Sequence, residues 1–193
     1  PLDFVRYYDS KNPYHYLSAP PQPLGNRWRH NHQVSLNPAA GTELVVMLRG
    51  DGRILYFRPK PGSANEWAGD ADIVGRLSKT VSGWSYQDAD EALETFDNTG
   101  KRLTRALPDG RSLSFSYDAA DLLIEVKDGF ERGLRLTYDA SGRLTTLTDP
   151  AGQDVNYTYD GEGSLASVGY PDLSKRRYSY TQVDVGGTVE PAL

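Results

Sequence analysis

The chain has 193 residues, of which 38% are hydrophobic and 11% aromatic, enough for the core of one or two domains. Its 21 Lys and Arg against 26 Asp and Glu give a net charge of −5, which argues against nucleic acid or an anionic membrane as partner, because both need a positive field. The absence of cysteine excludes thiol catalysis, disulfides and cysteine-bound zinc, and no apolar run reaches the roughly 18 to 20 residues of a membrane span.

Residues 1–85 are predicted to form a β-rich lead-in region. It opens with the strand-like run Leu2–Tyr8 and continues through a proline-rich loop at residues 19–25. The runs at 42–49 and 53–58 flank Gly50-Asp51-Gly52, a pattern that predicts a hairpin. Because the chain begins at Pro1 and enters a strand at once, we expect it to be a fragment or processed piece of a longer protein.

Two histidines in this region are candidate metal ligands. In a strand, His30 and His32 would share one face, as a metal site could use. Only His15 remains as a third histidine, and two nitrogens without a placed carboxylate make a poor site. An exposed or hydrogen-bonded histidine pair is therefore favoured, and no metal site is assigned.

Two acidic pairs are weighed in the same way. Asp70 with Asp72, and Asp88 with Asp90, each place two carboxylates on one side of an extended segment. A calcium loop needs six or more oxygen ligands, which neither pair spells out. We interpret both as solvated acidic loops.

An aromatic residue recurs every 21 residues from residue 96 to residue 180, and aspartate follows it at the first four of these five positions. A period of this length indicates an array in which each unit buries its apolar face against its neighbours. The signature aromatics and aspartates are Phe96, Asp97, Tyr117, Asp118, Tyr138, Asp139, Tyr159, Asp160 and Tyr180. In phase with them stand Gly100, Gly142, Gly163, Leu123, Leu144 and Leu165, with Asp121 in place of one glycine and Leu103 displaced by one residue.

Each unit is predicted to be strand, tight turn, strand and wider turn. Val155, Tyr157 and Tyr159 alternate with polar residues, which is the side-chain period of a strand. The glycine four residues after the aromatic is expected to supply a positive φ in the turn. Residues 86–180 would therefore hold four such units of about 21 residues, and residues 181–193 a connecting tail.

Register predicts two rows of side chains on one sheet face. Tyr117, Tyr138, Tyr159 and Tyr180 would form one row, and Phe115, Leu136, Tyr157 and Tyr178 the other. The last strand, near residues 177–180, is expected to be an open edge without protecting charge or proline. We expect self-association, or pairing with another segment of the same protein, through this edge.

The run from Tyr138 to Thr145 and the run from Asn156 to Asp160 resemble consecutive RHS repeats, also called YD repeats. The front segment resembles the lead-in of RHS proteins in Leu24-Gly25-Asn26-Arg27-Trp28 and in Arg49-Gly50-Asp51-Gly52-Arg53. The resemblance implies an all-β fold of successive antiparallel hairpins in one long curved sheet, a partial slice of an RHS shell. This chain lacks the C-terminal core motif of the family and a variable toxin.

The resemblance implies a non-enzymatic segment of a shell that encloses a C-terminal toxin in a secreted bacterial polymorphic toxin, often delivered by type VI secretion. Implied partners are the remaining repeats, the toxin and secretion components, and the implied location is secreted or at the cell surface. No cofactor, catalytic residue or Gly-x-Ser-x-Gly elbow is assigned. The alternatives are a carbohydrate-binding or adhesive module of a cell-surface protein, and, as a weaker reading, an enzyme.

Overall fold

The computed structural model describes residues 2–9, 22–38, 43–185 and 188–192. These residues form strands and turns, and the strands pair antiparallel. The chain divides into two compact units, one made of Pro1–Val5 with Asn31–Gly133 and the other of Arg6–His30 with Leu134–Leu193. The predicted all-β class and the order of successive antiparallel hairpins are confirmed.

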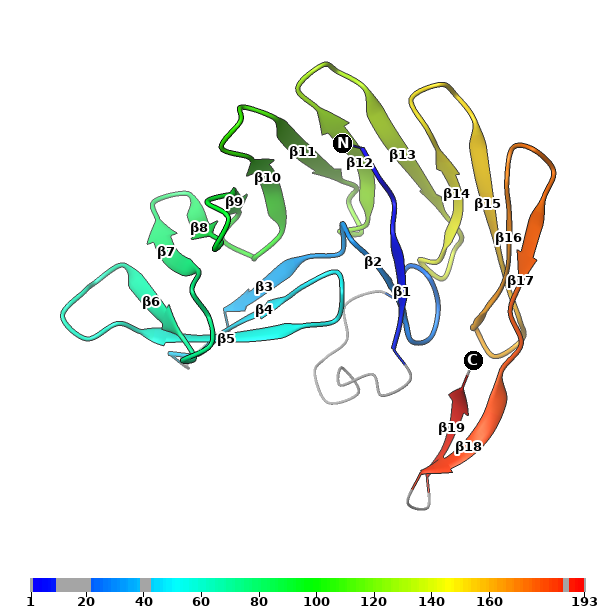
Figure 1. Cartoon of the computed structure of the whole chain (residues 1–193), viewed down its shortest axis with the longest axis horizontal. Coiled ribbons are helices and arrows are strands. Elements are labelled where there is room, and N and C mark those ends of the chain that lie inside the picture. Colours follow the sequence, from blue (N-terminus) through cyan, green and yellow to red (C-terminus); the bar gives the residue numbers. More distant parts are fainter. Residues whose placement is uncertain (1, 10–21, 39–42, 186–187, 193) are drawn as a thin grey trace. The chain divides into compact units, whose positions relative to one another are not determined.

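The first unit is a sheet in which each strand neighbours the next in the sequence (Figure 1). Its strands are β3 (Ser35–Pro38), β4 (Val45–Leu48), β5 (Ile54–Pro59), β6 (Glu66–Gly69), β7 (Arg76–Thr80), β8 (Gly83–Gln87), β9 (Leu93–Phe96), β10 (Arg102–Ala106), β11 (Ser112–Tyr117) and β12 (Leu123–Asp128). The predicted hairpin around Gly50-Asp51-Gly52 is present as β4 and β5.

The second unit holds the later hairpins and two separate strand pairs. Its hairpin strands are β13 (Gly133–Tyr138), β14 (Leu144–Thr148), β15 (Asp154–Tyr159), β16 (Leu165–Gly169) and β17 (Lys175–Arg177). The pairs are β1 (Arg6–Tyr8) with β2 (Trp28–His30), and β18 (Thr181–Val185) with β19 (Thr188–Ala192). The tail, expected to be a connecting segment, thus contains a hairpin of its own. The predicted limits at residues 85 and 180 stay predictions.

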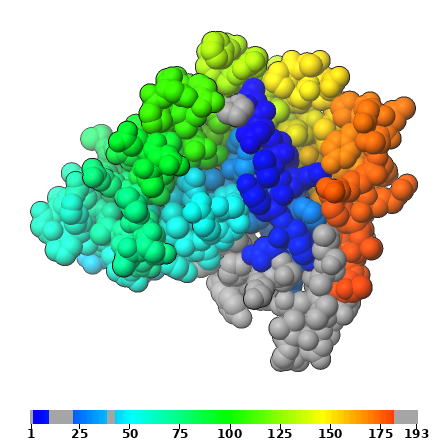
Figure 2. All heavy atoms as spheres, viewed as in Figure 1, coloured from blue at the N-terminus to red at the C-terminus, as the bar shows by residue number. Residues whose placement is uncertain are grey.

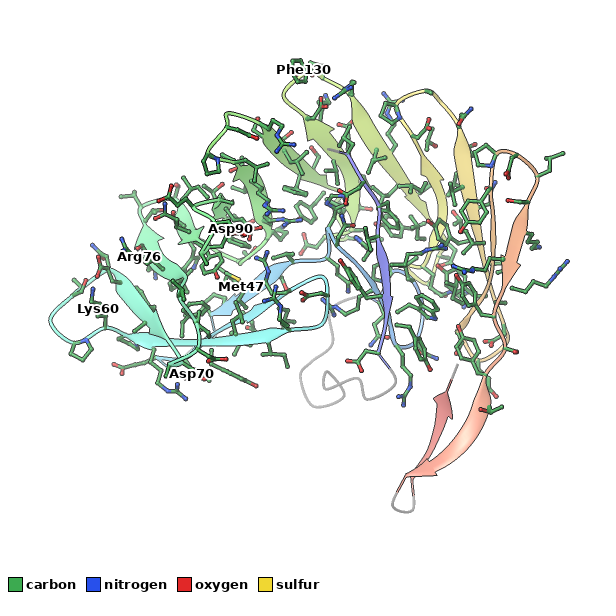
Figure 3. All side chains as sticks on the ribbon, viewed as in Figure 1. Met47, Lys60, Asp70, Arg76, Asp90 and Phe130 are labelled. Atoms are coloured by element: carbon green, nitrogen blue, oxygen red, sulfur yellow. The ribbon has the colours of Figure 1, made fainter. Side chains whose placement is uncertain are left out.

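Alternation along the strands decides which side chains are buried. In β11 and β15 every second residue is exposed, and the residues between them are buried or half-buried. The core of the first unit consists of Val34, Leu36, Val45, Met47, Phe57, Leu77, Trp84, Tyr86 and Phe96. Figure 3 shows Met47 within this unit, whereas Lys60 and Phe130 lie in the connections at the hairpin ends.

In the described part of the chain no helix is long and apolar enough to cross a membrane.

Candidate functional site: repeat turns, their cover and a buried ionic cluster

The signature aspartates bind the backbone of their own turns. In each turn one carboxylate oxygen, Oδ1, accepts hydrogen bonds from the N–H groups two and four residues ahead. For Asp139 the donors are Ser141 and Arg143, both at 2.9 Å. Asp97, Asp118 and Asp160 make the equivalent pair of bonds. The aspartate of the repeat is therefore a turn-forming residue, as Asp is in many tight turns.

The fourth residue of each turn has left-handed backbone geometry. Gly100, Gly142 and Gly163 have φ of 91°, 74° and 84°, and Asp121 has φ of 63° in the copy without glycine. The prediction of positive φ at Gly142 and Gly163 is confirmed. Asp121 is tolerated because a short polar side chain costs less in this region than a branched one.

The signature tyrosines connect one hairpin to the hairpin before it. The hydroxyl of Tyr117 donates to the Arg102 carbonyl at 3.0 Å, and that of Tyr180 donates to the Leu165 carbonyl at 2.7 Å. The hydroxyl of Tyr159 donates to the Leu144 carbonyl at 2.7 Å. Each bond spans 15 residues, so the repeat period itself positions donor and acceptor.

Burial of these phenols agrees with that structural role. Burial raises the pKa of Tyr117 to about 12 and that of Tyr180 to about 12, so both hydroxyls stay protonated donors. Burial also raises the pKa of Tyr159 and of Tyr157. A half-buried tyrosine with a bonded hydroxyl stabilises a sheet and leaves little ring surface for a ligand.

The register explains why the in-phase leucines are buried. A bulge precedes each tyrosine, so that Tyr117 pairs with Leu123, Tyr138 with Leu144 and Tyr159 with Leu165. All three leucines are buried, as are Phe115, Leu136 and Tyr157 two residues before the tyrosines. Within each of these strands the two row positions lie on one face.

In the second unit, the lead-in segment covers the repeat turns. The Pro23 carbonyl accepts hydrogen bonds from the Tyr159 hydroxyl at 3.0 Å and from Leu144 N at 2.6 Å. Leu24 is fully buried, and Asn26 N donates to the Gly163 carbonyl at 3.3 Å. The described end of the proline-rich loop, residues 23–25, thus docks on the tyrosine side of the repeats, and residues 19–21 of the loop lie outside the described residues.

Strands β1 and β2 continue this cover with aromatic contacts. The indole Nε1 of Trp28 donates to the Tyr180 hydroxyl at 2.8 Å, and its ring lies 4.9 Å from that of Tyr178. The Tyr8 ring packs on Trp28 at 5.2 Å and on Tyr180 at 6.2 Å. Within this unit, aromatic residues at the repeat period thus receive their partners from the lead-in region.

The first repeat, in contrast, has charge where later repeats have apolar residues. Glu94 stands two residues before Phe96, a position that Phe115 and Tyr157 occupy in later repeats. Arg102 stands 21 residues before Leu123, so it occupies the leucine position of the first repeat. The side chains of both are buried, with exposures of 0% and 2%. The repeat pattern did not predict this pair, because Leu103 matches the leucine position with a shift of one residue.

Three arginine side chains surround the Glu94 carboxylate. Arg49 Nη1 donates to Oε2 at 2.6 Å, and Arg102 Nη1 donates to Oε1 at 3.1 Å. Arg105 Nε lies 3.7 Å from Oε1. Arg102 also donates from Nη2 to the His32 carbonyl at 3.1 Å, and its guanidinium stacks on Phe115 at 3.9 Å. We call these residues the Glu94 cluster.

The charges of the cluster determine its protonation states. Burial alone would raise the pKa of Glu94, but Arg102, Arg49 and Arg105 together outweigh it and hold the pKa below its usual value. Burial, aided by Arg102, lowers the pKa of His32 to about 4. Glu94 is therefore ionised and His32 neutral at pH 7, in a cluster without a nucleophile.

The histidines weighed as metal ligands are placed differently from the expected strand. β2 ends at His30, and residues 31 and 32 form a turn, so the shared-face geometry is wrong. His32 Nε2 lies 2.7 Å from the Asp3 carbonyl oxygen. Over the residues that the structure describes, no group of three or more His, Asp or Glu side chains could hold a metal ion.

The acidic pairs have structural roles. Asp70 forms an ion pair with Arg58 at 2.7 Å. Asp88 accepts hydrogen bonds from the N–H groups of Asp90 and Ala92, which makes it another turn aspartate. Asp128 and Asp149, in the turns between successive repeats, accept the same pair of hydrogen bonds, so turn aspartates recur every ten or eleven residues from Asp118 to Asp160, a spacing that was not predicted from the sequence.

The last hairpin strand carries more charge than expected. β17 consists of Lys175, Arg176 and Arg177, and all three are exposed. The expectation of an edge without protecting charge is wrong, because three adjacent basic residues oppose pairing with an identical strand.

Comparison with known families gives two matches. The family model described as Teneurin YD-shell matches residues 76–186, more than half of the chain. A second model, described as a domain of unknown function (DUF6531), matches residues 1–57. Together they are typical of RHS-repeat proteins. A search among curated proteins found no match.

Proposed function

The chain belongs to the teneurin YD-shell family, and we propose that it forms part of the wall of an RHS-repeat shell that encloses a C-terminal toxin. The family is a structural shell rather than a catalytic domain. The toxin, delivery by a secretion system and a secreted or cell-surface location belong to the proposal.

The observation that carries the proposal is the use made of the signature residues. Tyrosine hydroxyls join successive hairpins, aspartates close the turns, and in-phase leucines fill the core. These contacts engage the signature side chains within the sheet itself. Such a repeat is suited to forming the wall of a shell. It offers no free constellation for catalysis.

The test uses the parent protein with its C-terminal region. In the wild type we expect that region to resist added protease, because a closed wall keeps protease out. Tyr159→Ala removes a contact between hairpins and should expose the region to cleavage, whereas Ser141→Ala, in an exposed turn, should not. Equal cleavage of the C-terminal region in wild type and Tyr159→Ala would contradict the proposal.

A glycan array separates this function from the adhesive alternative. Wild-type chain that binds a glycan, with binding lost on Tyr138→Ala but kept in Ser141→Ala, would favour the carbohydrate-binding module. We expect no such binding, since the signature hydroxyls are engaged within the protein.

A further inference from the structure

Strand β15 contains an acceptor sequence for an N-linked sugar. Asn156 is followed by Tyr157 and Thr158, and no other asparagine of the chain has serine or threonine two residues ahead. The pattern Asn-x-Thr, with no proline between, is the signal that oligosaccharyltransferases read. Alternation along the strand places Asn156 and Thr158 on one face, and both are exposed. In Figure 2 this part of the chain, coloured yellow to orange, lies at the molecular surface.

The face of β15 that carries Asn156 is opposite the face on which the lead-in segment docks. Tyr157 and Tyr159 point to that other face. There the Tyr159 hydroxyl donates to the Pro23 carbonyl at 3.0 Å. The Arg6 guanidinium lies 5.8 Å from the centre of the Tyr157 ring on the same side. Within the second unit, a bulky group on Asn156 would therefore displace none of these contacts.

The amide of Asn156 is held by its oxygen, and its nitrogen is available. Oδ1 accepts a hydrogen bond from Thr146 Oγ1 at 3.3 Å. Nδ2, the atom that would carry the sugar, donates to no acceptor among the described residues. On the other neighbouring strand Asn156 stands opposite Gly169, and a Cβ at Gly169 would meet no atom within 4 Å. The surface beside Asn156 therefore has room for a sugar ring.

We propose that Asn156 carries an N-linked glycan, donated by an oligosaccharide on a lipid diphosphate. Nδ2 forms a bond to C1 of the first sugar, the C1–O bond breaks, its electron pair leaves with the lipid diphosphate, and one amide proton passes to a base. Because β15 pairs with both β14 and β16, the transfer takes place on the extended chain before this strand joins the sheet. The proposal rests on the secreted or cell-surface location in the proposed function.

The test uses the parent protein collected outside the producing cells. Trypsin releases residues 144–175, a peptide in which Asn156 is the only asparagine. We expect most copies of this peptide to carry the added mass of an oligosaccharide. Fragmentation by electron transfer in the mass spectrometer should locate the sugar on Asn156 rather than on a hydroxyl.

Variants separate an acceptor signal from a side chain that is merely exposed. Thr158→Ala should abolish the modification although Asn156 itself is unchanged, and Thr158→Ser should retain it, because the signal needs a hydroxyl at this position. Thr137→Ala, which removes an exposed threonine of β13, is the matched control and should leave the glycan in place.

Asp154 distinguishes two kinds of transferase. It is exposed and stands two residues before Asn156. Loss of the sugar in Asp154→Asn would indicate an enzyme that also requires an acidic residue at this position, and retention would indicate one that reads Asn-x-Thr alone. Both results support Asn156 as the acceptor, since each needs a modified wild type.

Three results would overturn the proposal. Unmodified peptide 144–175 from the secreted protein would show that Asn156 is no acceptor. Sugar retained in Thr158→Ala, or located on a serine or threonine, would show another kind of linkage. None of these results bears on the wall, which is tested by protease protection of the C-terminal region. Conversely, unprotected C-terminal region in a protein glycosylated at Asn156 would contradict the wall and leave the glycan site standing.

Discussion

The first repeat and the later repeats fill equivalent core positions with different kinds of side chain. In the first unit the two core positions of the repeat hold Glu94 and Arg102, an ion pair at 3.1 Å. In the second unit the equivalent positions hold Tyr157 and Leu165, which are buried apolar side chains. The turns and the strand register are the same in both, although the first repeat has Phe96, which carries no hydroxyl, at the position of the signature tyrosine. The architecture thus depends on turn chemistry and period, and the filling of the core can vary.

The two regions also resemble each other in how the lead-in chain attaches to a turn. In the first unit Leu36 N donates to the Gly100 carbonyl at 2.9 Å, and in the second Asn26 N donates to the Gly163 carbonyl at 3.3 Å. The tolerance for a side chain differs, since a Cβ on Gly100 would overlap the Leu36 carbonyl, whereas a Cβ on Gly163 would meet side-chain atoms of Arg143 and Asn26 only at 3.8 Å, an ordinary contact distance.

The largest expected effect is the loss of stability when the buried ion pair of the first repeat is broken. Glu94→Leu should destabilise the protein by about 3 to 5 kcal/mol, because Arg102 is left buried without a counter-charge. Glu94→Leu combined with Arg102→Leu should recover much of this loss, since the two positions then match the apolar later repeats. Urea unfolding of the singles and the double measures the coupling.

A surface pair serves as the control for this cycle. Arg132→Gln removes an ion pair with Asp128 in which the arginine is exposed, so the free energy of unfolding should change by less than about 0.5 kcal/mol. If the double variant were less stable than Glu94→Leu alone, the equivalence between ionic and apolar cores would be wrong.

The second prediction compares the two glycine turns. Gly100→Ala should cost about 2 to 4 kcal/mol, because strained φ adds to an overlap with the Leu36 backbone. Gly163→Ala should cost only about 1 kcal/mol, the price of left-handed backbone alone. Melting temperatures of the two variants test this, and equal shifts would show that the close approach of Leu36 contributes nothing.

The third prediction uses pH to probe the Glu94 cluster. Because the folded pKa of His32 is about 4 and the unfolded value about 6.5, the unfolded chain binds a proton first as pH falls. Stability should therefore decrease below pH 6.5, by about 1.4 kcal/mol at pH 5.5 for this group alone. The loss from His32 should be complete near pH 4. Glu94 adds a loss of its own only toward the acid end of this range, where the unfolded carboxyl, with a pKa of about 4.5, takes up a proton while the folded one, with its lowered pKa, stays ionised.

Chemical unfolding of wild type and His32→Gln at pH 7 and pH 5.5 isolates the effect. The variant should lose less stability between the two values than the wild type. An identical pH dependence in both proteins would mean that His32 does not resist protonation in the fold.

The smallest expected effect is the loss of stability when one tyrosine hydroxyl is removed, compared between the second unit and the first. Tyr159→Phe removes a hydroxyl that donates toward the carbonyl oxygens of Leu144 and Pro23, and should cost about 1 to 2 kcal/mol. Tyr117→Phe removes a single bond to the Arg102 carbonyl and should cost about 1 kcal/mol or less. Thermal unfolding distinguishes them. A larger loss for Tyr117→Phe would contradict the contribution of the lead-in loop.

The turns and strands could be predicted from the sequence because short-range residue patterns determine them. Period-two alternation predicted the faces of β11 and β15, and the glycine spacing predicted positive φ at Gly142 and Gly163. The exact repeat of Tyr and Asp predicted the hairpin array, since each unit needs the same turn at the same interval.

Tertiary structure decided what each repeat packs against. The docking of Pro23 and Trp28 on the later repeats joins residues more than a hundred positions apart, which no periodic pattern records. The burial of Glu94 depends on Arg49 from a distant hairpin, so composition alone could only describe both as surface charges. Which side chains are buried depends on the packing of segments that are distant in the sequence. A charged side chain can be buried in the core only when the fold places an oppositely charged partner beside it.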